Sequence, residues 1–182
     1  MALLHQATLT PPKPELIAAW LPSQPWAAGL PEVTPIGGFR LDDPAGEVGI
    51  EGILLRSADG GVVVHVPLTY RAAPLEGAED ALLGTTEHSV LGTRWVYDAP
   101  ADPVYRAALT ATIVEGGTGA EEYFEVDGER IAREPKVSVA GSGGGPGEIV
   151  VVRVVGEEGE SESVLTGAWD GGSGVLAALR TS

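Results

Sequence analysis

Residues 48–70 read VGIEGILLRSADGGVVVHVPLTY and decide the fold. Two apolar runs flank Asp59-Gly60, and a tight hairpin turn needs the positive φ that glycine adopts at little cost. The second run places four apolar side chains on one face, because side chains alternate along a strand: Val62, Val64, Val66 and Leu68. The sequence therefore predicts a β hairpin, with His65 half exposed on the face opposite these residues.

Two helices are predicted outside the hairpin. Residues 14–21 carry apolar side chains with helical spacing, begin with a proline and are followed by Pro22, which is typical of a short amphipathic helix. A second helix is expected from Asp102-Pro103 to about residue 115, because an acid at the N-cap and a proline at the first helical position favour helix initiation. Gly116-Gly117 ends it.

Further strands are predicted on both sides of these elements. Residues 33–41 form one run, and residues 82–98 form one or two, broken near Gly92. Beyond Gly117 short strands alternate with glycine-rich turns, at residues 121–126, 136–140, 148–155 and 163–168. We therefore expect an α+β fold, with a curved antiparallel sheet flanked by a few helices and a smaller C-terminal β-rich portion. A boundary is placed between residues 1–117 and 118–182.

The composition excludes several classes of function. A formal net charge of -15 repels nucleic-acid phosphates and anionic lipid headgroups. The chain has no Cys, so disulfides, thiolate metal sites and cysteine nucleophiles are ruled out. No apolar run reaches the ~18 residues of a membrane span, and the N-terminal residues lack the features of a secretory signal. A cytoplasmic protein is expected.

Three segments resemble a known family, and they read EHSVLG at residues 87–92, WVYDA at 95–99 and DPVYR at 102–106. Together with the preceding helix and hairpin, they resemble the N-terminal cap of actinobacterial maltokinases over roughly residues 1–117. The remainder resembles a truncated, degenerate form of the intermediate lobe of those kinases. This likeness implies a link to maltose, trehalose or α-glucan metabolism.

The same resemblance argues against kinase activity. The segment that corresponds to the phosphate-facing loop, residues 156–163, carries four glutamates, and carboxylates repel phosphates. Ala177 and Ala178 stand where the family places its phosphate-pairing lysine, and the chain contains no Asn for a second Mg²⁺. The sequence also stops before the family's catalytic and metal-binding loops. We therefore expect no catalytic residues, no cofactor and no enzyme activity.

A small group of polar and aromatic residues is the candidate binding site. His88 precedes Arg94, Tyr97 and Asp98, and these side chains are expected to gather at a sheet edge. A hydrogen-bonded structural network is the alternative. Trp169, in a glycine-rich context, is predicted to be exposed, and its flat ring suits a sugar.

No metal site is predicted, because the three histidines, His5, His65 and His88, are far apart in sequence.

Two functions are consistent with the sequence. The first is a non-catalytic accessory or interaction protein whose partner is a protein of maltose, trehalose or α-glucan metabolism. The alternative is a small-ligand binding module for an oligosaccharide or phosphosugar, which requires a concave pocket with convergent polar side chains. The oligomeric state stays open.

Overall fold

The computed structural model describes residues 2–4, 7–126, 129–157 and 159–180. The chain is mostly β, with few helices, in agreement with the coarse α+β prediction. None of the described helices is long and apolar enough to cross a membrane. The helical elements are α1 (Lys13–Trp20), α2 (Pro103–Val114) and the short 3-10 turns η1 (Leu21–Ser23), η2 (Pro25–Ala27), η3 (Glu79–Ala81) and η4 (Ala99–Ala101).

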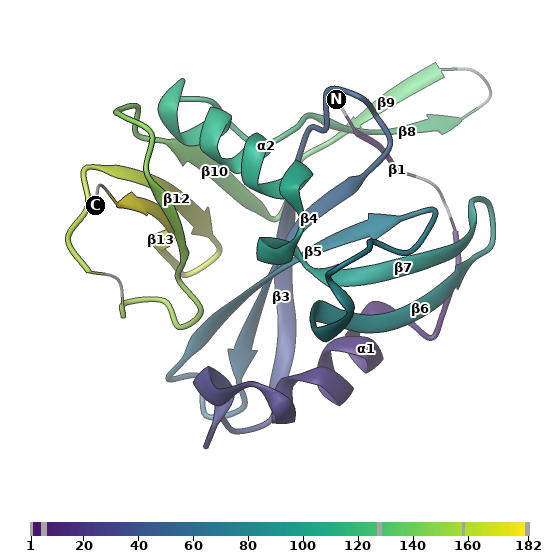
Figure 1. The fold of residues 1–182 in the computed structure, drawn as a ribbon, viewed down its shortest axis with the longest axis horizontal. Coiled ribbons are helices and arrows are strands. Elements are labelled where there is room, and N and C mark those ends of the chain that lie inside the picture. The colour runs from purple at the N-terminus through teal and green to yellow at the C-terminus, as the bar shows by residue number, and fades with distance from the viewer. Residues whose placement is uncertain (1, 5–6, 127–128, 158, 181–182) are drawn as a thin grey trace.

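A six-stranded antiparallel sheet forms the centre of the molecule, with the order β2-β6-β7-β5-β4-β3 (Figure 1). Its strands are β2 (Leu9–Thr10), β3 (Val33–Leu41), β4 (Gly49–Ser57), β5 (Val63–Arg71), β6 (Leu82–His88) and β7 (Gly92–Asp98). The predicted hairpin is confirmed as β4 and β5. Gly60 has φ 75° in its turn, and the Val62 carbonyl accepts the Ser57 N–H at 2.9 Å.

One face of the central sheet is covered by α1 and the two 3-10 turns after it. Leu16, Ile17 and Trp20 of α1 are buried against the strands. Trp26 is half buried and lies 6.0 Å from Trp20 between ring centroids, so it is a second apolar anchor on this face. The apolar stripe read from the sequence is therefore the contact surface of this helix.

The opposite face is covered by α2 and a second, four-stranded antiparallel sheet with the order β10-β12-β13-β11 (Figure 1). Its strands are β10 (Val137–Gly141), β11 (Glu148–Val151), β12 (Ser163–Trp169) and β13 (Gly172–Arg180). Phe39 and Leu109 share one buried cluster with Val137, Leu165 and Leu176. Residues on both sides of the expected 117/118 boundary thus pack into one core.

The prediction of a half-exposed His65 is wrong, because this side chain is 0% exposed. His65 does lie on the face opposite the valines, but the second sheet covers that face, and its Nδ1 lies 3.1 Å from the Leu176 carbonyl oxygen. The Phe39 ring lies above Gly52, where a Cβ would stand 2.2 Å from the ring. Glycine at this position makes room for Phe39 beside His65.

A third, three-stranded sheet has the order β1-β8-β9 and consists of β1 (Ala2–Leu4), β8 (Glu122–Val126) and β9 (Glu129–Arg133). β1 runs parallel to β8, and β9 is antiparallel to it. The sequence predicted β8 but not β9, whose residues are mainly charged and lack apolar alternation.

Candidate ligand-binding site

A pocket of about 650 Å³ lies between the central sheet and the three-stranded sheet. Its wall combines residues from the N-terminal segment, α1, the strands β3 to β7, the loop after β3, and the hairpin of β8 and β9. The polar and aromatic residues of this wall used below are Lys13, Arg40, Glu51, Tyr70, His88, Arg94, Glu122, Tyr123, Phe124 and Arg133.

Glu51 is the centre of the polar network in this pocket. One of its oxygens, Oε2, accepts from Lys13 Nζ at 2.5 Å and from Tyr70 Oη at 2.8 Å. Arg40 stands directly across the β3–β4 ladder from Glu51, with Nη2 3.8 Å from the same oxygen. One carboxylate therefore fixes the positions of three side chains that come from α1, β3 and β5.

The protonation states follow from these contacts. Burial acts to raise the pKa of Glu51, but the charges of Lys13 and Arg40 outweigh it, so the pKa lies below its ordinary value. Burial and the Glu51 charge raise the pKa of Tyr70 well above its ordinary value. Glu51 is therefore an ionised acceptor and Tyr70 a protonated donor at neutral pH.

A second carboxylate lies on the opposite wall of the pocket. Glu122 of β8 is buried, and one of its oxygens is 3.8 Å from Nη1 of Arg133 on β9. Burial raises the pKa of Glu122, while Arg40 and Arg133 act in the opposite direction. The pocket thus places carboxylate acceptors among guanidinium and ammonium donors, next to the rings of Tyr70, Tyr123 and Phe124.

Two of the five predicted site residues line this pocket, His88 and Arg94. The imidazole Nδ1 of His88 accepts the N–H groups of Val90 and Leu91 at 3.2 and 3.1 Å, so this ring also holds the turn between β6 and β7. Arg94 is half buried and donates to the Thr93 carbonyl oxygen at 3.3 Å. Both side chains lie on the side of the pocket that β6 and β7 form.

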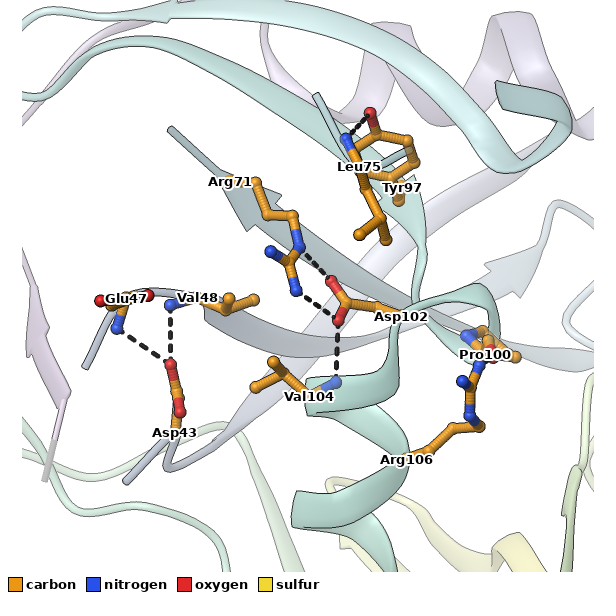
Figure 2. A network of polar contacts seen from close by, with 10 residues as sticks. All are labelled: Asp43, Glu47, Val48, Arg71, Leu75, Tyr97, Pro100, Asp102, Val104 and Arg106. Carbon is orange, nitrogen blue, oxygen red and sulfur yellow. Dashed lines mark hydrogen bonds and ion pairs between the residues drawn. The ribbon is translucent and has the colours of Figure 1, made fainter. Parts of the chain in front are cut away.

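Tyr97 and Asp98 do not belong to the pocket wall. Tyr97 is 2% exposed, and its hydroxyl accepts the Leu75 N–H at 2.8 Å (Figure 2). Asp98 is paired with Arg153 Nη2 at 2.6 Å, and burial raises the pKa of Asp98 although Arg153 opposes it. Both side chains make contacts within the fold.

Arg153 joins the C-terminal half of the chain to the helical layer of the N-terminal half. Its guanidinium lies 5.1 Å from the Trp26 ring centroid and 6.0 Å from that of Trp20, while it pairs with Asp98. A cation over aromatic faces is stabilised by the ring quadrupole. The Arg153 backbone also reaches the central sheet, because its carbonyl oxygen accepts the His65 N–H at 2.9 Å.

The prediction that Trp169 is exposed is also wrong. Its ring is half buried at the end of β12 and packs against the buried cluster between the second sheet and the central sheet. It does not line the pocket. Gly172 of β13 makes room for the ring, because a Cβ at this position would lie 3.1 Å from Trp169 Nε1.

The sequence missed Lys13, Arg40, Glu51 and Glu122. A charged residue within an apolar strand, such as Glu51 in β4, was the available signal. No described group of three or more His, Asp or Glu side chains has the arrangement of a metal site. His5 lies outside the described residues, as does Glu158 of the glutamate-rich loop.

The fold and pocket define a β-sheet module whose pocket wall is assembled from several parts of the chain. In comparison with known families, the maltokinase N-terminal cap domain matches residues 20–102. The match runs from the end of α1 to the N-cap of α2, so this segment is similar to a maltokinase N-terminal cap domain. No curated protein matches the chain significantly.

The matched segment contains only part of the pocket. Arg40, Glu51, Tyr70, His88 and Arg94 lie within it, and Lys13, Glu122 and Arg133 lie outside. The pocket is consequently completed by segments that flank the matched residues.

Proposed function

We propose that the chain is a non-catalytic accessory module that binds an enzyme of maltose, trehalose or α-glucan metabolism. The observation that carries this proposal is the match of residues 20–102 to the maltokinase N-terminal cap domain. Support comes from the sequence, which lacks Asn and offers Ala177 and Ala178 at the positions that correspond to the phosphate-pairing lysine. A fold shared with a kinase module does not itself carry kinase activity.

A kinetic experiment tests this function. A maltose-phosphorylating kinase from the source organism is assayed for kcat and KM with increasing amounts of the chain, followed by enzymes that act on trehalose and α-glucans. We expect at least one enzyme to respond, with a change that saturates as its binding sites fill. If none of these enzymes responds to the chain, the accessory role is overturned. Phosphate transfer from ATP-Mg²⁺ to maltose by the chain alone would overturn its non-catalytic character.

A second function, small-ligand binding, is favoured by the pocket. Its wall offers ionised acceptors at Glu51 and fixed donors at Lys13, Arg40 and Arg94, beside aromatic rings. Sugar hydroxyls both donate and accept hydrogen bonds, so they suit a wall that mixes both kinds of group, and aromatic faces pack on pyranose rings. The ligand class that fits is an oligosaccharide or a phosphosugar.

Calorimetric titration with maltose, trehalose, maltose 1-phosphate and short α-glucans tests the pocket, with ATP-Mg²⁺ as a further arm. For a sugar that binds, we expect Arg94→Ala to weaken the affinity about tenfold, because a hydrogen bond to a charged group contributes roughly 1.5 kcal/mol or more. The matched control is Arg106→Ala, which removes an exposed arginine of α2 that does not line the pocket. Equal losses in both variants, or no heat with any sugar, would contradict this function.

A further inference from the structure

β9 is an unprotected sheet edge. Among the residues that the structure describes, it pairs with β8 alone, and it ends the three-stranded sheet. Among the strands whose side chains the structure describes, it alone has every residue exposed. Such a strand presents unpaired backbone N–H and C=O groups, and these favour pairing with a strand from another chain.

The sequence of β9 is complementary to itself in antiparallel orientation. It reads Glu129-Arg130-Ile131-Ala132-Arg133. When two copies of this strand pair antiparallel about Ile131, each Glu129 stands opposite Arg133 of the other copy and the two Ile131 side chains face each other. Opposite charges at directly opposed positions stabilise a strand pair, and like charges destabilise it.

The same register continues an apolar row across the sheet. Ile131 is 51% exposed and already stands opposite Phe124 in the β8–β9 ladder. Self-pairing would place Phe124 and Ile131 of one copy in line with Ile131 and Phe124 of the other. Val126, on the same face of β8, is 39% exposed, so the apolar surface of this hairpin is larger than one residue.

The charged residues of β9 can contact β8 of their own chain and β9 of a second copy at the same time. The Arg133 side chain is 43% exposed, and its distance of 3.8 Å from Glu122 leaves guanidinium donors for a second carboxylate. β8 and β9 already pair opposite charges within one chain, with Glu122 opposite Arg133 and Glu125 opposite Arg130. The second copy would repeat this pattern at the outer edge.

We propose that two copies of the chain associate through β9, joining their three-stranded sheets into one continuous six-stranded sheet. The occupant of the edge is a second copy because the strand is complementary in charge to itself. The contact is short compared with stable protein interfaces, which bury roughly 800 Å² per partner. The net charge of -15 on each copy also opposes association. A weak dimer that depends on concentration is therefore expected.

Sedimentation velocity at increasing concentration tests the proposal with charge reversals. Glu129→Arg places two arginines opposite each other in the homodimer, and Arg133→Glu places two glutamates, so each variant alone should stay monomeric where the native chain dimerises. An equimolar mixture of the two variants restores both opposite-charge pairs and should dimerise again. Glu76→Arg and Arg106→Glu are the matched controls, because they make the same charge changes at exposed positions away from β9.

Circular dichroism and thermal unfolding of each variant establish that it is folded before it is compared. The proposal is overturned if the native chain is monomeric at every concentration. In that case β9 would pair with a different protein or with no partner strand. It is also overturned if both single variants still dimerise, or if their mixture fails to. These outcomes are independent of the ligand and the enzyme partner considered above.

Discussion

At the scale of single residues, the buried His65 makes the stability of the folded protein depend on pH. Burial, with a smaller contribution from the charge of Arg153, lowers its pKa to about 3. The folded state therefore keeps the ring neutral, whereas the unfolded chain protonates it near 6.5. The unfolded state binds the additional proton between these two values, so this residue reduces stability progressively as the pH falls below about 6.5.

The expected contribution of His65 is a loss of up to about 1.4 kcal/mol of unfolding free energy per pH unit. Urea unfolding between pH 6.5 and 5 measures it in the native chain and in His65→Gln, which keeps a donor for the Leu176 carbonyl oxygen. The pH slope should be less steep in the variant. Identical slopes for the native chain and His65→Gln would show that the folded protein protonates His65.

At the scale of elements, Asp102 fixes the start of α2 on the central sheet. Its carboxylate accepts from Arg71 Nε and Nη2 at 2.7 and 2.8 Å, and from the Val104 N–H at 2.9 Å (Figure 2). Burial acts to raise the pKa of Asp102, but Arg71 and the Val104 N–H prevail and lower it. Figure 2 also shows Asp43, whose carboxylate holds Glu47 and Val48 in the loop that lines the pocket.

We expect Asp102→Ala to lower the free energy of unfolding by about 3 kcal/mol, because it removes a helix cap and leaves Arg71 without its partner. Asp102→Asn keeps a capping oxygen and should cost less. Chemical denaturation of both variants measures these differences. Asp80→Ala, at an exposed position, should stay within about 0.5 kcal/mol of the native chain. A similar small effect for Asp102→Ala would mean that the cap and ion pair contribute little.

For the whole molecule, the core determines what can fold alone. Leu54, Tyr105 and Ile113 pack in the same buried cluster as Leu165 and Leu179, across the boundary expected after residue 117. A fragment of residues 1–117 would expose these apolar side chains to water, at a cost of roughly 25 cal/mol for each Å².

We therefore expect the fragment of residues 1–117 to bind the dye ANS and to lack a sharp thermal transition. The full chain should unfold in one transition that fluorescence and far-ultraviolet circular dichroism report at the same temperature. Calorimetry of both proteins provides the comparison. A fragment that unfolds cooperatively would establish residues 1–117 as an independent domain.

The parts of this fold that the sequence predicted are local. The hairpin of β4 and β5 depends on Asp59-Gly60, and the start of α2 depends on Asp102-Pro103, because turns and caps are decided by neighbouring residues. His88 and Arg94 were predicted to belong to one site for the same reason, since they lie on strands joined by a short turn.

Contacts between residues that are distant in sequence were decided only by the tertiary structure. Lys13 and Glu51 are 38 residues apart, and Asp98 and Arg153 are 55 apart. The burial of His65 requires a second sheet whose strands come from the end of the chain. Sequence periodicity indicates which face of a strand is apolar, but the packing of sheets determines what covers each face. The pocket, which is assembled from segments across the chain, belongs to this second kind of information.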